Sequence, residues 1–138
     1  MIARPLARET KSLIGQQVVG QFRIFCILLF MKKLPADFVY LPEMYEDPYF
    51  PGFLVNKIKT EIQKVVRFLE QGDHSKEEVQ SALDKMTLAI NNLQDEFLEN
   101  QSEIETAARE AIGATVERIL EYFQIDIGVE EAIRERDW

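Results

Sequence analysis

The sequence of 138 residues has only one cysteine, Cys26, and only one histidine, His74. A lone cysteine excludes a disulfide framework within the chain and a zinc site of paired cysteines. A lone histidine leaves little from which to build a histidine-based metal site or a catalytic triad. The six glycines are scattered and form no phosphate-binding loop. The composition therefore predicts no cofactor and a reducing, cytoplasmic setting.

Long hydrophobic runs are also absent. After Arg23, the uncharged apolar stretch covers only residues 24–31, far short of the ~20 residues that span a bilayer. We therefore expect no transmembrane segment. Lys32 and Lys33 follow this stretch where a signal peptide would have small residues, so a cleaved signal peptide is also disfavoured.

Charge divides the chain near residue 33. Residues 1–33 hold six basic side chains and one acidic one, a net charge of +5, and the whole chain carries −8, so residues 34–138 carry −13. The first part is interpreted as a basic, apolar extension. Three alternatives stay open for it: a segment packed on the main domain, a membrane-surface anchor, or residues upstream of a natural start at Met31.

The acidic part, residues 34–138, predicts the class of partner. A domain with this charge repels phosphate backbones, so nucleic-acid binding is not expected. A basic protein partner fits the charge better, although solubility alone also explains it.

Apolar residues recur at helical spacing from residue 54 onward. The stripe begins at Leu54, Ile58 and Ile62 and predicts a first long helix that ends at Gly72. A second stripe runs from residue 79 to 97 and a third from 104 to 123, with a short helix expected at 129–135. The prolines within residues 35–51 predict that this aromatic-rich segment, which precedes the helices, is extended. The fold class is therefore all-α, a compact antiparallel bundle of three long helices plus a short C-terminal helix.

Two short motifs predict where helices begin. Ser75 with Glu78, and Ser102 with Glu105, each have the spacing of a capping box, in which both side chains bond to backbone N–H groups at the helix start. Pairs across one helical turn are expected between Glu105 and Arg109 and between Glu130 and Arg134. His74 is expected to be solvated in the turn before Ser75.

Carboxylates and aromatic residues supply the candidate binding residues. Acidic side chains gather at residues 95–105, and Asp95 and Glu99 lie opposite the apolar stripe, where they should face water. Trp138, at the C-terminus, either docks on the bundle, the favoured reading, or anchors a partner. The candidate partner-binding residues are Tyr45, Glu46, Asp47, Tyr49, Asp95, Glu99, Glu103 and Trp138.

The leading functional hypothesis is a non-enzymatic protein–protein interaction module, an acidic helical bundle in the manner of immunity or antitoxin proteins. The alternative is a carboxylate-based enzyme, with or without a divalent ion. Its candidate acids are Glu46, Asp47, Glu99 and Glu103. An enzyme of that kind needs acids that converge in a pocket. No catalytic, cofactor-binding or metal-ligating residue is predicted otherwise.

Several segments resemble a family of small bacterial proteins that is classed only as a domain of unknown function. They are the stretch from Met44 to Pro51, the junction from Leu93 to Arg109, and the closing Arg136-Asp137-Trp138. The resemblance covers residues 40–138 and implies a compact, cytoplasmic domain. It implies no catalytic residue, because the family supplies none.

Overall fold

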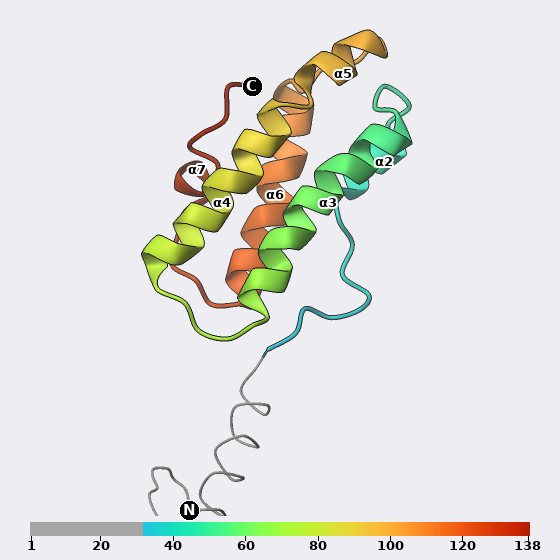
Figure 1. Ribbon diagram of the computed structural model, residues 1–138. Helices are drawn as coiled ribbons and strands as arrows, with labels where there is room; N and C mark the ends of the chain where they lie inside the picture. The colour runs from blue at the N-terminus through green and yellow to red at the C-terminus, as the bar shows by residue number, and fades with distance from the viewer. Residues whose placement is uncertain (1–31) are drawn as a thin grey trace, which may run out of the picture. The chain divides into compact units, whose positions relative to one another are not determined.

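Three long helices form the frame of the computed structural model, which describes residues 32–138. They are α3 (Gly52–Leu69), α4 (Lys76–Asn91) and α6 (Thr106–Tyr122). Of the short helices, α2 (Pro42–Glu46) precedes α3, α5 (Gln94–Glu99) lies between α4 and α6, and α7 (Val129–Ala132) follows α6. α3, α4 and α6 alternate in direction, as Figure 1 shows. The predicted all-helical bundle is confirmed. The predictions for the N-terminal extension concern residues 1–33, of which residues 1–31 lie outside the described part.

The predicted apolar stripes form the core. Leu54 and Ile58 of α3, Ile90 of α4 and Ile112 of α6 are fully buried, and Leu83 is 1% exposed. Each such side chain stabilises the fold by roughly 1.5–3 kcal/mol relative to its exposed state. Burial of one face on each long helix is what holds the three helices together.

The first capping box is confirmed. Ser75 is the N-cap of α4, its hydroxyl accepts a hydrogen bond from the Glu78 N–H at 3.1 Å, and the Glu78 carboxylate accepts from the Ser75 N–H at 2.9 Å. Two otherwise unpaired backbone donors are thereby satisfied.

Three predictions about helix extent are wrong. The proline-rich segment is not extended throughout, because α2 starts at Pro42, and proline suits a first helical position. The second stripe, from residue 79 to 97, does not form one continuous helix, because α4 ends at Asn91 and α5 begins at Gln94. Asn91 and Asn92 mark the break, and asparagine favours caps and turns over helix interiors. α7 also ends at Ala132, three residues before the predicted end.

The second capping box, predicted at Ser102 and Glu105, is wrong. The N-cap of α6 is Glu105, which makes no side-chain cap bond, and the buried Ser102 hydroxyl has no hydrogen-bond partner among residues 32–138. The end of α5 explains the difference. The Ser102 N–H bonds to the Phe97 carbonyl and the Gln101 N–H to the Leu98 carbonyl. This pair of bonds is a Schellman motif, so Ser102 closes the preceding helix instead of opening the next one.

Gln101 and Gln124 occupy the left-handed position of two such helix ends, each with φ of 58°. That backbone conformation costs a non-glycine residue roughly 1–2 kcal/mol. Glycine avoids this cost but loses about 0.5–1 kcal/mol of chain entropy on folding. We therefore expect Gln101→Gly and Gln124→Gly each to stabilise the fold by about 0.5–1 kcal/mol. Urea unfolding measures this. The matched control is Gln71→Gly, at an exposed turn position without positive φ, which should not stabilise; equal effects at all three sites would contradict the explanation.

The C-terminal segment is held against α4 by polar contacts. The Asn91 side chain donates to the Glu135 carbonyl at 2.8 Å and accepts from the Asp137 N–H at 3.3 Å. The guanidinium of Arg134 lies 2.8 Å from a carboxylate oxygen of Asp84 and 2.9 Å from one of Glu131. The predicted partner of Arg134, Glu130, instead pairs with Arg136. The predicted Glu105–Arg109 ion pair is also wrong, because no ion pair joins the two side chains within residues 32–138; the two residues are linked by the backbone bond from the Arg109 N–H to the Glu105 carbonyl.

The contact between Asp84 and Arg134 predicts a pH dependence of stability. Partial burial of Asp84 raises the pKa of its carboxyl, but hydrogen bonds from Arg134 and Gln80 and the charge of Arg134 outweigh burial and lower the pKa below 3.8. A lowered pKa in the folded state stabilises the fold above pH 3.8, and this contribution is lost as the pH falls through the folded-state pKa. Asp84→Asn should therefore lower the melting temperature at pH 7, and the difference from the wild type should shrink toward zero in acid.

Asp126→Asn is the matched control for Asp84→Asn, because Asp126 is exposed and pairs with no described residue. Its melting temperature should follow the wild type at every pH. A difference between Asp84→Asn and wild type that stays constant from pH 7 to pH 2.5 would contradict the ion-pair explanation.

Candidate functional site

The candidate residues other than Trp138 lie on segments that meet at one end of the bundle. The segments are the end of α2 with its connection to α3, the short helix α5, and the loop at residues 100–105, and Figure 1 shows α5 and the α2–α3 connection at the same end. We call this surface the acidic-aromatic end. Its residues are Tyr45, Glu46, Asp47, Tyr49, Phe53, Asp95, Glu96, Leu98, Glu99, Glu103 and Glu105.

Tyr49 has the most clearly acidic surroundings of these residues. Its side chain is 40% exposed. Partial desolvation and the negative charges of Glu105, Glu103 and Asp47 raise the pKa of its hydroxyl above the ordinary value of 10.0. The Asp47 carboxylate also accepts a hydrogen bond from the Tyr49 N–H at 2.9 Å. The predicted residues Asp47 and Glu103 are therefore near enough to Tyr49 for their charges to act on its hydroxyl.

Two contacts fix the segments of the acidic-aromatic end to α3. The Tyr45 hydroxyl donates to the Asn56 side-chain oxygen, which ties α2 to α3, and burial raises the pKa of that hydroxyl. The Lys57 ammonium lies 2.8 Å from a carboxylate oxygen of Glu96 and ties α3 to α5. Glu96 is the only one of the seven carboxylates of this end that forms an ion pair with another described residue. The surface therefore keeps an excess of negative charge.

Large apolar side chains lie among these carboxylates. Phe53 is 50% exposed and Leu98 is 56% exposed. Phe53, Leu98 and Glu105 were not predicted as binding residues from the sequence. Helical periodicity could have predicted their exposure, because Phe53 and Leu98 directly adjoin the core residues Leu54 and Phe97 and so lie off the buried stripe. An apolar residue off the stripe of an amphipathic helix is expected to face water.

Asp95 and Glu99 are exposed, as predicted from periodicity, and Glu46 is exposed as well. Asp95 and Glu99 lie on α5 with Glu96, and Glu46 ends α2. Within residues 32–138, no hydrogen bond or ion pair joins these three side chains to Tyr49. They add charge to the surface without forming a shared pocket.

Trp138 does not belong to the acidic-aromatic end. Its side chain is half-buried and packs against the hydrophobic core, so the favoured prediction that it docks on the bundle is confirmed. The indole N–H is buried without a hydrogen-bond partner among residues 32–138. The neighbouring Asp137 is bound by Gln94 and Asn91, which fixes the end of the chain.

The prediction that His74 is solvated is wrong. Its ring is only 18% exposed and stacks on Phe68, with the ring centroids 3.7 Å apart and an interplanar angle of 13°. Nε2 donates to the Phe68 carbonyl at 2.8 Å. His74 thus closes the turn between α3 and α4.

No group of three or more histidine, cysteine, aspartate or glutamate side chains within residues 32–138 is placed to hold a metal ion. Among the described helices, none has both the length and the apolar character needed to cross a membrane.

The comparisons with known proteins agree with the resemblance noted in the sequence. The chain matches the profile of DUF5713, a family of unknown function, over residues 35–138. No curated protein and no solved structure matches the chain. The match covers the long helices, the acidic-aromatic end and the docked C-terminal segment, and the chain therefore belongs to the DUF5713 family.

Proposed function

We propose that the domain is a non-enzymatic protein–protein interaction module, in the manner of immunity or antitoxin proteins, and that its acidic-aromatic end binds a basic protein partner. The observation that carries this proposal is the half-exposed ring of Tyr49 among the charges of Asp47, Glu103 and Glu105.

The chemistry of this surface favours a lysine- or arginine-bearing partner. A cation over the face of a tyrosine is attracted by the ring, by about 0.5–1 kcal/mol at exposed sites. Neighbouring carboxylates add charge-assisted hydrogen bonds, which are stronger than neutral ones. An arginine placed over Tyr49 could therefore meet both the ring and a carboxylate.

The apolar residues of the same surface supply area that a partner could bury. Tyr45, Phe53 and Leu98 are all more than 40% exposed. Aromatic residues surrounded by polar groups are typical of the residues that dominate binding at protein interfaces. The combination of a charged rim and aromatic anchors supports a protein partner over a small cation.

The alternative of a carboxylate-based enzyme has no specific observation in its favour within residues 32–138. Acid–base catalysis by paired carboxylates needs burial to separate their pKa values. The candidate acids Glu46, Asp47, Glu99 and Glu103 are all exposed.

Affinity capture with charge variants tests the proposal. The full chain, the variant Glu103→Gln/Glu105→Gln and the matched control Glu117→Gln/Glu121→Gln are each used as bait in lysate of the native host. Glu117 and Glu121 are exposed on α6 and form no ion pair with a described residue, so both variants remove two surface charges. We expect a basic protein to be recovered by wild type and control, and about three- to tenfold less of it by the Glu103→Gln/Glu105→Gln variant.

Salt provides a second readout of the same capture. The Debye length falls to about 3 Å at 1 M ionic strength, which weakens attraction between exposed charges. The partner should therefore elute as salt is raised. Recovery of the same protein in equal amounts by all three baits would contradict a role for the acidic-aromatic end. A captured partner with an acidic surface would contradict the charge complementarity.

A further inference from the structure

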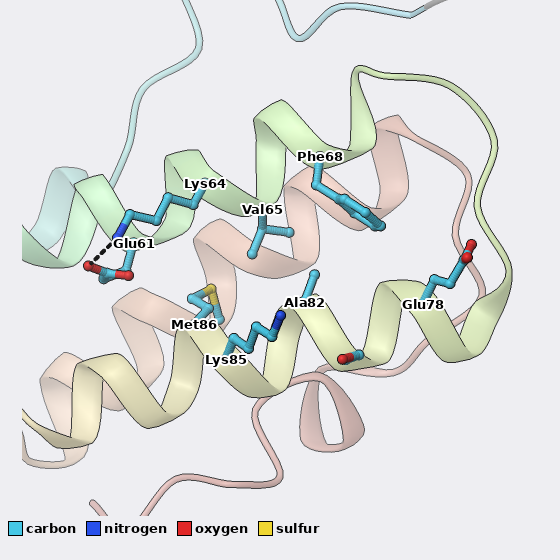
Figure 2. A pocket seen from close by; sticks show the side chains of 9 residues that line it. Glu61, Lys64, Val65, Phe68, Glu78, Ala82, Lys85 and Met86 are labelled. Carbon is cyan, nitrogen blue, oxygen red and sulfur yellow. Dashed lines mark hydrogen bonds and ion pairs between the residues drawn. The ribbon is translucent and has the colours of Figure 1, made fainter.

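We propose that a groove between α3 and α4 binds a small amphiphilic carboxylate, a molecule with an alkyl or aromatic body and one anionic end. Figure 2 shows this groove, which has a volume of about 540 Å³. It lies along the C-terminal half of α3 and the N-terminal half of α4, whereas the acidic-aromatic end adjoins the N-terminal end of α3. Its lining residues are Glu61, Lys64, Val65, Phe68, Glu78, Ser81, Ala82, Lys85 and Met86.

The floor of the groove is apolar and firmly held. Val65 and Met86 are 4% and 2% exposed, and Phe68 and Ala82 are half-buried beside them. The stacked ring of His74 and its hydrogen bond to the Phe68 carbonyl hold Phe68 in place. A volume of this size falls in the range of about 300–1,000 Å³ that is usual for small-molecule sites, which are mostly apolar with a few polar groups.

The charged groups around the groove are paired, with one exception. Lys64 lies 3.1 Å from a carboxylate oxygen of Glu61. The carboxylate of Glu78 accepts the Ser75 N–H in the capping box and faces His74 at 3.7 Å. Lys85 forms no ion pair with any other residue of the described range. Figure 2 shows its Nζ beside Ala82, next to the apolar floor.

A free ammonium next to a fixed apolar floor selects an anion with an apolar body. The body would cover Phe68, Ala82 and Met86, while its carboxylate would take a charge-assisted hydrogen bond from Lys85. A cationic amphiphile would find the same floor but would be repelled by Lys85. Residues 34–138 carry a net charge of −13, so a site for an anion on this domain depends on this local positive group.

The test uses sodium decanoate, below its micelle concentration, as the probe and the amide chemical shifts of the full chain as the readout. Decyltrimethylammonium is the charge-inverted control. We expect decanoate to cause saturable shifts centred on Val65, Phe68, Ala82 and Met86, with weaker binding of the cationic amphiphile. Lys85→Gln should weaken decanoate binding by about three- to fivefold.

Lys76→Gln is the matched control, because Lys76 is an exposed residue of the same helix outside the groove. It should leave decanoate binding unchanged. The proposal is overturned by the absence of saturable shifts, by shifts centred on another surface, or by equal affinity for both amphiphiles together with no effect of Lys85→Gln. Both variants replace exposed side chains, so each is expected to fold.

Discussion

Phe97→Ala is expected to lower the free energy of unfolding by about 3–5 kcal/mol, the largest effect of any single substitution considered. Phe97 is fully buried and is the only buried residue of α5. Its carbonyl also accepts the bonds from Asn100 and Ser102 that end the helix. Loss of the ring would leave a cavity and would remove the contact that holds α5 on the core.

Leu98→Ala is the matched control, since Leu98 is the next residue of the same helix and is 56% exposed. It should change stability by less than about 0.5 kcal/mol. Urea unfolding compares the two variants directly. A Phe97→Ala variant no less stable than Leu98→Ala would show that α5 does not depend on this side chain.

Thr115→Val is expected to destabilise the fold by about 1–3 kcal/mol, although the two side chains have nearly the same shape. The Thr115 hydroxyl accepts a hydrogen bond from the Leu41 N–H at 3.1 Å, and both residues are fully buried. Leu41 is in the left-handed region, with φ of 51°. Valine at position 115 would leave the Leu41 N–H buried without this partner, at a residue whose backbone is already strained.

The control for Thr115→Val is the same substitution at Thr87, which is also fully buried. The Thr87 hydroxyl donates to the Leu83 carbonyl one turn earlier in α4. That carbonyl is still bonded within the helix when the hydroxyl is lost. Thr87→Val should therefore have little effect on the urea midpoint, and equal destabilisation by the two variants would contradict the explanation.

The parts of the fold that could be predicted depend on neighbours within one or two helical turns. The stripe through Leu54, Ile58 and Ile62 and the capping box at Ser75 and Glu78 are both of this kind. Ser102 and Glu105 show the same spacing, yet the bonds at the end of α5 take the Ser102 N–H. A local motif therefore predicts a cap only when the preceding helix does not use the same backbone group.

The candidate site was predictable in composition but not in arrangement. Acidic and aromatic residues were found from the sequence, and Asp47 and Tyr49 are neighbours in the chain. The proximity of Glu103 and Glu105 to Tyr49 depends on how the loop at 100–105 packs near the α2–α3 connection, more than fifty residues away. The left-handed backbone of Leu41 likewise depends on Thr115 of α6. Contacts of this range are set by packing and leave no periodic signal in the sequence.

Photo-cross-linking in living cells tests most directly whether the acidic-aromatic end binds a partner. p-Benzoylphenylalanine replaces Phe53 in one full-length variant and Leu88 of α4 in another; the native side chains are 50% and 48% exposed. We predict that illumination links a basic protein to the chain with the probe at position 53 and not at position 88. A probe at position 53 that captures no protein, or the same proteins captured equally from both positions, would contradict the proposed function.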